Sequence, residues 1–480
     1  MIRVEEDAQK TDAQPSPQHL KHASRGSCTG RSRRGAFRLR ARIASVRPRG
    51  QVGRHCPARS LGYHGQMAVT ARHKLDVAAV RADFPFLEEL VDGRPFAYLD
   101  SAASAQKPRQ VIDGIARFYA HSYANVHRGV YPLAERATDG YEGAREKVRA
   151  FLNAPSVREV IFTRGTTEGI NLVAYAWGLD NLGPGDVVVA TDLEHHSNFV
   201  PWQYVAQRTG ATFTTIPVDG AGELVLDDLD RIAALGAVKA VAIGYVSNAL
   251  GTINPVERLV AWAREQGAIS FVDAAQAAPH RAIDVQALGC DFLALSAHKL
   301  CGPTSVGALW GRAAILERMA PFNLGGHMIR KVTHERTTWG ELPAKYEAGT
   351  SPIAEAYGFG LAIDYLTALG LDAIEEHEQQ LLRYALERLP EVPGITLYGP
   401  PPERRAGVVA FNLGAVHPHD VAQVLGFEGV CIRAGHHCTQ PLMQRFDLVA
   451  TNRASFYLYT TEQEIDRLVD GLQLVQRKLG

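Results

Sequence analysis

The string SAHKLCGP, Ser296 to Pro303, follows the apolar run 292–295 and carries Lys299. A second apolar run, AISFV, ends at Asp273, which opens the string VDAAQA and lies 26 residues before the lysine. Short apolar runs bounded by polar residues are typical of buried strands. The sequence therefore predicts one strand that ends in a carboxylate and a later strand that ends in a lysine.

Three other apolar runs, at 159–163, 187–191 and 240–246, extend this pattern over the region from Tyr98 to Thr350. Residues 256–266, which follow the third of them, present an apolar helical face. Strand, helix and strand at this spacing predict an α/β fold with a mostly parallel sheet that helices cover on both faces. Ligands of such sheets bind at the carboxyl ends of the strands.

Polar side chains follow all five runs at the point where each strand is expected to end. In chain order they are Thr166 and Thr167, His195, Asn248, Asp273 and Lys299. Because parallel strands end at the same edge of a sheet, we expect these side chains to converge on one site.

A lysine and a buried carboxylate at strand ends suit an enzyme that uses pyridoxal phosphate (PLP). The lysine amine forms a Schiff base with the aldehyde of the cofactor, and the carboxylate keeps the pyridine nitrogen protonated so that the ring accepts electrons. Either fragment alone is also compatible with an ordinary turn beside a buried Asp. The two together with the other strand-end groups favour a PLP site.

Two further strings fit this interpretation. RGTTEGIN, residues 164–171, places Thr166 and Thr167 at the positive start of a helix, where they suit a phosphate group or act as a plain helix cap. EHHSN, residues 194–198, offers His195 for stacking on a planar cofactor, or simply a solvated loop histidine. Metal binding is disfavoured because adjacent side chains diverge and no third ligand stands at a suitable spacing.

RAGHHC, residues 433–438, places Cys438 in a glycine-containing loop with Arg433 and two histidines. Such a positive setting favours a reactive thiolate, which makes Cys438 a candidate nucleophile, although an incidental loop cysteine is the alternative. Arg453, in the string TNRASFYLY, is a candidate to bind a substrate carboxylate through two guanidinium nitrogens. An ordinary surface ion pair is the other interpretation of this arginine.

The net charge of zero divides unevenly along the chain. Residues 1–66 hold 14 Lys/Arg and 4 Asp/Glu (+10), so the remaining 37 Lys/Arg and 47 Asp/Glu carry −10. An acidic body argues against nucleic-acid binding, and no apolar stretch approaches the ~20 residues that span a bilayer. Six scattered cysteines without a CxxC pair favour a reducing compartment, and we expect a cytoplasmic protein.

Residues 1–66 lack periodicity and are predicted to be a disordered basic extension, or the result of a start codon assigned too early. No apolar run follows the arginine pair as a twin-arginine signal requires, and the acidic residues argue against a transit peptide. We expect residues 67–95 to form an N-terminal segment that packs with the small domain, 96–355 to form a large domain and 356–480 to form that small domain. Its predicted elements are a long helix over 354–388, strands at 408–413 and 430–433, and helices at 419–425 and 461–478.

Ten strings in order resemble the fold-type I PLP enzymes of the class V aminotransferase family, and more closely the Suf-type (group II) cysteine desulfurases and selenocysteine lyases. They are YLDSAASAQKP, ANVHRG, RGTTEGINLVA, EHHSNFVPW, YVSNALGT, VDAAQA, SAHKLCGP, EAGTSP, RAGHHCTQPLM and NRASFYLY. The resemblance runs from about Leu75 to Gly480. It implies a seven-stranded, mostly parallel sheet in a large PLP-binding domain, a smaller α/β C-terminal domain, and a homodimer.

The resemblance also implies a role for each candidate site residue. Lys299, Cys438 and His195 are then catalytic; Thr166, Thr167, His195, Asp273, Gln276, Ser296, His298 and Lys299 bind PLP, together with the partner subunit's Thr350; and Asn248, Arg453, His127 and Arg433 bind the substrate. No metal site is expected in this chain.

The implied reaction converts L-cysteine to L-alanine and leaves the sulfur as a persulfide on Cys438, which supplies iron–sulfur cluster assembly. Selenocysteine lyase, class V aminotransferase and a catalytically silent partner in a sulfur-transfer complex are the alternatives. The strings imply a small, zinc-bearing, scaffold-like protein as the sulfur acceptor, on whose zinc His419 replaces a cysteine ligand. A histidine that caps a surface helix is the other interpretation of His419.

Overall fold

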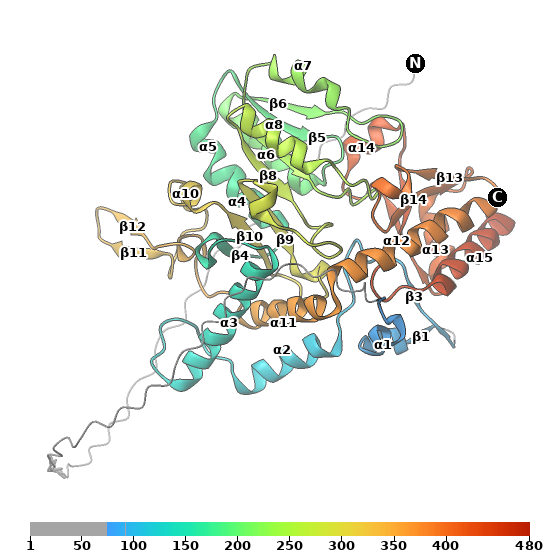
Figure 1. The fold of residues 1–480 in the computed structure, drawn as a ribbon, viewed down its shortest axis with the longest axis horizontal. Helices are drawn as coiled ribbons and strands as arrows, with labels where there is room; N and C mark the ends of the chain where they lie inside the picture. Colours follow the sequence, from blue (N-terminus) through green and yellow to red (C-terminus); the bar gives the residue numbers. More distant parts are fainter. Residues whose placement is uncertain (1–73, 92) are drawn as a thin grey trace, which may run out of the picture. The chain divides into compact units, whose positions relative to one another are not determined.

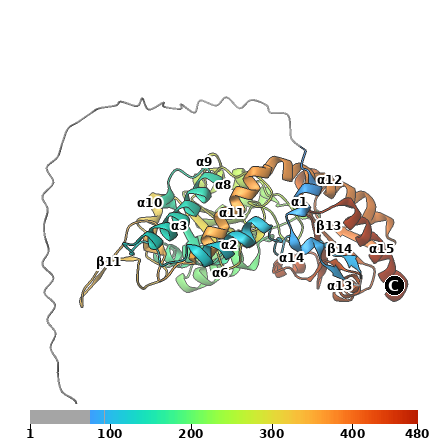
Figure 2. The ribbon, with the colours of Figure 1, turned by 90° about the horizontal axis from the view of Figure 1, so that it is seen from below.

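The structure, a computed structural model, describes residues 74–91 and 93–480 (Figure 1; Figure 2). The predicted disordered extension at 1–66 lies outside the described residues, as does the start of the predicted N-terminal segment at residue 67. Within the described ranges, no helix is long and apolar enough to cross a membrane.

The main sheet has seven strands in the order β4-β10-β9-β8-β7-β5-β6 (Figure 1). They are β4 (Val160–Thr163), β5 (Asp186–Thr191), β6 (Thr212–Ile216), β7 (Ala237–Gly244), β8 (Ile269–Asp273), β9 (Phe292–Ser296) and β10 (Gly307–Gly311). Only β10 runs antiparallel to its neighbours, so the other six strands share one direction. The predicted α/β sheet and its five predicted strands are confirmed. The run at 240–246 belongs to β7, which ends at Gly244, and the Asn254 amide donates to the Gly244 carbonyl there (2.7 Å).

Both faces of this sheet are buried, and successive residues of a strand face opposite layers. Val187 and Val189 pack in one apolar cluster, with helices α3 (Pro132–Phe151), α8 (Val256–Glu265) and α11 (Ile353–Leu369). Val188 packs in the other cluster, with α4 (Thr166–Ala176) and α6 (His196–Thr209). This alternation is the period of two that a strand imposes on its side chains. The predicted helix at 256–266 is confirmed as α8.

Smaller elements complete the region around the sheet. They are α1 (Val77–Ala82), α2 (Arg109–His121), α5 (Gly178–Asn181), α7 (Leu229–Ala233), α9 (Val285–Leu288), α10 (Ala313–Leu316) and the hairpins β1–β2 (Leu90–Val91, Arg94–Pro95) and β11–β12 (Ile329–Val332, Thr337–Trp339). Helix α11 packs against both α2 and α3, and Figure 2 shows the three side by side.

A second, antiparallel sheet lies in the C-terminal part of the chain, in the order β13-β14-β17-β16. Its strands are β13 (Ile395–Tyr398), β14 (Val408–Leu413), β16 (Arg433–Gly435) and β17 (Thr451–Ser455), and its helices are α12 (Leu371–Arg388), α13 (Pro418–Phe427), α14 (Gln440–Arg445) and α15 (Glu462–Leu479). Three predicted elements, at 408–413, 419–425 and 461–478, are confirmed as β14, α13 and α15. Thr461 and Glu464 form a capping box that starts α15 where the sequence places it.

Two predicted elements of this region are wrong in their continuity. The helix expected over 354–388 is two helices, α11 and α12, which meet at Gly370, whose φ of +86° no continuous helix adopts. The strand expected at 430–433 divides into β15 (Val430–Cys431) and β16. β15 leaves the second sheet and pairs in parallel with β3 (Ala97–Tyr98).

The N-terminal segment contacts the end of the chain. The Arg81 guanidinium, in α1, lies 3.1 Å from the Glu464 carboxylate at the start of α15. This contact agrees with an N-terminal segment that packs on the C-terminal part. The domain limits at 67–95, 96–355 and 356–480 stay a prediction.

A buried ion pair ties the segment before α11 to the main sheet. The Glu347 carboxylate accepts hydrogen bonds from two guanidinium nitrogens of Arg145, at 2.6 and 2.9 Å, and from the Phe162 amide at 2.7 Å. The two charged side chains are only 1% and 4% exposed. Because water cannot replace either partner, removal of one leaves the other charge buried and uncompensated.

We therefore predict that Glu347→Ala lowers the free energy of unfolding by about 3–5 kcal/mol. Equilibrium unfolding in urea measures the change, and Glu341→Ala, at an exposed position six residues earlier, is the control. A loss for Glu347→Ala no larger than that for Glu341→Ala would contradict this role.

Candidate active site

The side chains predicted to converge do line one cavity of about 340 Å³ at the carboxyl end of the main sheet. The cavity is lined by Thr166, Thr167, His195, Asn248, Asp273, Gln276, Ser296, His298, Lys299, Arg433, Cys438 and Arg453, among others. A volume of this size holds a small cofactor together with a small substrate. Of the candidate residues, Thr350, His127 and His419 do not line it.

Parallel pairing explains why Asp273 and Lys299 meet. Asp273 is the last residue of β8 and pairs with Ala294 of β9, two residues before that strand ends. Lys299 follows β9 in a short turn of helix, Ala297–Lys299. Both side chains line the cavity, Asp273 is buried and Lys299 is partly buried, and their charges interact.

Burial sets the protonation of this pair. Desolvation lowers the pKa of the Lys299 ammonium to about 8, against the opposing attraction of Asp273. Burial likewise raises the pKa of the Asp273 carboxyl, and the Lys299 charge opposes that shift. The neutral amine of Lys299 is therefore accessible near neutral pH, which an amine that attacks a carbonyl carbon requires.

A group of hydroxyls surrounds the start of α4. The Ser296 hydroxyl accepts a hydrogen bond from the Thr166 amide (2.9 Å) and lies 2.8 Å from the Thr166 hydroxyl. The Thr167 hydroxyl lies 2.7 Å from that of Ser197. Gly165 allows this approach, because its φ is +139° and a Cβ there would lie 3.1 Å from the Ser296 hydroxyl. Hydroxyls and the positive end of a helix together suit a phosphate.

Two histidines of the cavity are neutral at physiological pH. Burial lowers the pKa of His195 and of His298 to about 4 in each case. His195 caps α6, where its Nδ1 accepts a hydrogen bond from the Ser197 amide (3.1 Å). The Nδ1 of His298 lies 3.3 Å from the Ser104 hydroxyl. Neutral, fixed rings suit stacking and hydrogen bonding rather than ion pairing.

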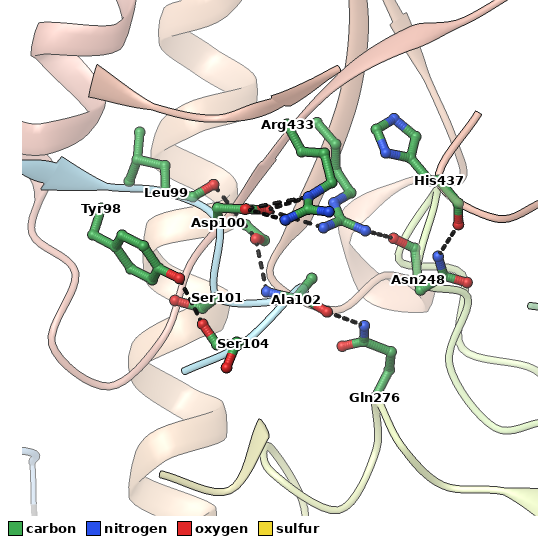
Figure 3. Close-up of polar contacts among 12 residues, drawn as sticks. Tyr98, Leu99, Asp100, Ser101, Ala102, Ser104, Asn248, Gln276, Arg433 and His437 are labelled. Atoms are coloured by element: carbon green, nitrogen blue, oxygen red, sulfur yellow. Dashed lines mark hydrogen bonds and ion pairs between the residues drawn. The ribbon is translucent and has the colours of Figure 1, made fainter. Parts of the chain in front are cut away.

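Two arginines of the second sheet, Arg433 and Arg453, share the Asp100 carboxylate beside the cavity, and Figure 3 labels Arg433 and Asp100. Arg453 donates to Asp100 (3.1 Å) and to the Asn248 carbonyl (2.8 Å). Arg433 donates to both oxygens of Asp100, at 2.9–3.2 Å. Two positive charges against one negative charge leave a net positive site, and the buried Nε of Arg453 has no hydrogen-bond partner among the described residues. This arrangement suits a substrate carboxylate.

The Cys438 loop lies between the cavity and solvent. Cys438 lines the cavity and is nevertheless exposed. The Asn248 amide donates to the His437 carbonyl (2.6 Å), which fixes the loop against the main sheet (Figure 3). By contrast, burial raises the pKa of the Cys290 and Cys301 thiols to about 12. Of the four cysteines that the structure describes, Cys438 is the exposed one.

Three residues at the site were missed by the sequence analysis, and two of them, Ser197 and Glu194, line the cavity. Asp100 stands after the short apolar run 96–99, which resembles the other strand ends, and this signal could have identified it. Ser197 lies in EHHSN, but only the fold shows that it meets Thr167. Glu194 precedes His195 and accepts hydrogen bonds from Thr191, Asn198 and the Gly244 amide at 2.6–2.8 Å. It fixes the turn that presents His195, and burial raises its pKa to about 8.

Thr350 and His127 lie together in a different hollow of the chain, with His327. The imidazoles of His127 and His327 stack with their centroids 4.8 Å apart. His419 is exposed on α13, and it is His417, not His419, that caps this helix: its Nδ1 accepts from the His419 amide (3.3 Å). The cap interpretation of His419 is therefore wrong.

The donor set of the cavity fits PLP. Lys299 would hold its aldehyde, Asp273 its pyridine nitrogen, and the hydroxyls of Thr166, Thr167, Ser197 and Ser296 its phosphate. The Gln276 amide, fixed by a 2.6 Å hydrogen bond to the Ala102 carbonyl, is placed for the ring hydroxyl (Figure 3). His195 lines the same cavity and suits the ring face.

Comparison with known proteins identifies the family. Residues 97–468 match the family model described as Aminotransferase class-V. A "Probable cysteine desulfurase" of Halalkalibacterium halodurans is 54% identical over 397 residues, which cover 83% of this chain and 97% of the relative. A cysteine desulfurase of Haloferax volcanii is 47% identical over 419 residues, covering 85% and 98%. The solved apo cysteine desulfurase of Thermococcus onnurineus is 37% identical, with a TM-score of 0.80 over 85% of this chain and 100% of that one. With most of its length matched and its cavity suited to PLP, the chain belongs to the class V aminotransferase family.

Proposed function

We propose that this chain is a PLP-dependent cysteine desulfurase of the Suf type that carries sulfur on Cys438. Relatives named cysteine desulfurase, 54% and 47% identical over most of the chain, support the activity. The observation that carries the proposal is that an exposed thiol, Cys438, lines the same cavity as Lys299 and Asp273. A simple transfer of the amino group to a keto acid has no need of a thiol there.

PLP supplies, when bound, an electron-accepting ring that acidifies the α-proton of an amino acid and weakens its bond from Cβ to sulfur. Lys299 would hold the cofactor aldehyde and would take the α-proton of the substrate at Nζ, since its lowered pKa makes the neutral amine available. Asp273 would hold the pyridine nitrogen in its protonated form. His195 would stack on the ring, because the hydrogen bond that its Nδ1 accepts from the Ser197 amide fixes its orientation.

The substrate carboxylate binds to Arg453, with Asn248 and Arg433 beside it. His127, which the family resemblance also assigns to the substrate, belongs to the second hollow and would act only from a partner subunit. These contacts orient the substrate so that its Cβ–Sγ bond faces the loop of Cys438. Because the guanidinium is fixed, binding of the carboxylate also positions the reacting sulfur of the substrate.

The Cys438 thiolate then attacks the substrate sulfur. A new S–S bond forms and the Cβ–Sγ bond breaks; its electron pair stays on Cβ, which takes up a proton. The products are alanine and the persulfide of Cys438, so that the substrate carbon is reduced and the transferred sulfur is oxidised without any outside oxidant. The sulfur then serves iron–sulfur cluster assembly.

Selenocysteine lyase and aminotransferase activity are the second candidates, because both use the same lysine and carboxylate. Neither requires Cys438, so a variant of this residue separates them from the desulfurase. A catalytically silent role in a sulfur-transfer complex is disfavoured by the presence of Lys299, Asp273 and Cys438 in one cavity.

We also propose a homodimer and a protein acceptor for the sulfur. Thr350 and His127 are close together but outside the PLP cavity of their own chain, as expected for residues that complete the site of a second copy. His419 is exposed on α13, which contacts the strand β16 that leads to the Cys438 loop. This placement supports contact between His419 and a zinc-bearing acceptor that docks at the loop. A cytoplasmic location also remains part of the proposal.

The lowered pKa of Lys299 predicts how the cofactor-free protein takes up PLP. Only the neutral amine reacts with the aldehyde, so the rate of appearance of the lysine-linked visible absorbance should rise with pH and reach half its maximum near pH 8. Stopped-flow absorbance measures this rate across pH 6–11, a range that includes both the lowered pKa of about 8 and the ordinary lysine pKa of 10.5. A midpoint near the ordinary lysine pKa of 10.5 contradicts the buried setting, and Lys299→Ala should give no such absorbance at any pH.

Replacement of the thiol tests the proposed function itself. Cys438→Ala should still bind PLP and L-cysteine but should lose essentially all persulfide and at least about a hundredfold in alanine production, because its nucleophile is absent. Mass spectrometry after exposure to L-cysteine locates the persulfide, and Cys431→Ala is the control that keeps it. Full alanine production by Cys438→Ala, or a persulfide on Cys431 or Cys301 in the parent enzyme, would refute the assignment.

The proposed role of His419 predicts a selective loss. His419→Ala should keep the basal rate with L-cysteine but lose stimulation by a zinc-bearing acceptor, since imidazole is a good zinc ligand whereas a methyl group is none. His417→Asn, which removes a neighbouring imidazole but keeps a side chain suited to the helix cap, should be stimulated like the parent. Equal stimulation of His419→Ala and the parent would exclude the zinc contact.

A further inference from the structure

The loop that carries Cys438 has an unfavourable backbone conformation. His437 and Cys438 have φ values of +50° and +57°, in the left-handed region that residues other than glycine rarely adopt. Two such residues in succession persist only where surrounding contacts hold them. The question is therefore which groups keep the backbone of Cys438 in place.

Two histidines bind the backbone on either side of the nucleophile. The Nδ1 of His436 accepts a hydrogen bond from the Cys438 amide (3.1 Å). The Nε2 of His196 accepts one from the Gln440 amide (3.1 Å). The amide of His196 in turn donates to the Cys438 carbonyl (2.7 Å). The two imidazoles lie near each other, with their centroids 5.6 Å apart.

We propose that His196 and His436 are positioning residues that hold the Cys438 thiol toward the cavity for attack on the substrate sulfur, an inference that rests on the proposed function. Neither imidazole lines the cavity, so neither is placed to touch substrate or cofactor. They act through the backbone. His436 fixes the amide of Cys438 itself, and His196 fixes the amide of Gln440, the first residue of α14.

His196 also links the loop to the cofactor side of the cavity. It is the first residue of α6, directly after His195, whose ring lines the cavity and caps the same helix. The hydrogen bonds of His196 therefore tie Cys438, from the second sheet's region, to the turn that presents His195. Cys438 is exposed, so little packing fixes its position. The hydrogen bonds of His196 can supply this constraint for a thiol that must reach the substrate on one side and the acceptor on the other.

The two histidines accept with different ring nitrogens, and this difference allows a matched test. An Asn side chain places an oxygen near the position of a histidine Nδ1, whereas a Gln side chain reaches the position of Nε2. His436→Asn and His196→Gln should therefore keep the hydrogen bonds to the loop. His436→Gln and His196→Asn carry the same chemical group in the wrong place and should lose them.

In the PLP-loaded enzyme, the two mismatched variants should form the Cys438 persulfide about fivefold to tenfold more slowly in a single turnover with L-cysteine, the factor expected for one lost hydrogen bond. The matched variants should stay within about twofold of the parent. The early absorbance change of PLP on mixing with L-cysteine should be the same in all four variants, because it precedes sulfur transfer. Alkylation of Cys438 by iodoacetamide should not slow in any of them, since it needs only an accessible thiol.

Equal persulfide rates for the Asn and Gln variants at either position would overturn the proposal, and so would slower alkylation in the mismatched variants, which would mean a less reactive thiol rather than a misplaced one. Failure of the proposed function has a different signature. In that case even the parent forms alanine from L-cysteine without a persulfide on Cys438, whatever residue stands at 196 or 436.

Discussion

The parallel pairing of β8 with β9 is the constraint on which the site depends. It delivers Asp273 and Lys299 to the same edge of the sheet, where both line one cavity. Burial then sets their chemistry: an amine whose pKa falls to about 8 stands beside a carboxyl whose pKa rises. The apolar layers on both faces of the sheet hold this edge in place, and desolvation there lowers the pKa of the lysine, so the same packing that stabilises the fold prepares the lysine.

The second sheet completes the cavity from the other side. Its strands β16 and β17 bring Arg433 and Arg453, and Asp100, which follows β3, binds both. The Cys438 loop then closes against Asn248 and His196 of the main-sheet region. The lysine side is thus fixed by buried strands, whereas the thiol side is fixed by hydrogen bonds to an exposed loop. This difference agrees with the proposed roles, since the lysine binds one cofactor whereas the thiol must react first with the substrate and then with the sulfur acceptor.

Much of this arrangement could be predicted from the sequence because strand ends carry a local signal. The five apolar runs fixed where Thr166, His195, Asn248, Asp273 and Lys299 would meet, without any knowledge of the strand order. What failed depended on longer-range packing. Gly370 has a helical pattern on both sides, and only its φ of +86° shows that α11 and α12 are separate. Likewise, the contact between Ser197 and Thr167 depends on how α4 and α6 pack.

The most direct test of the account is to find which lysine holds PLP. Sodium borohydride reduction fixes the cofactor to that lysine, and peptide mass spectrometry then locates it. Lys107 is the nearest rival, since burial also lowers its pKa and its ammonium lies 3.2 Å from the His298 carbonyl. The account predicts the added mass on the peptide that contains Lys299. The added mass on the peptide of Lys107, with Lys299 unmodified, would contradict it.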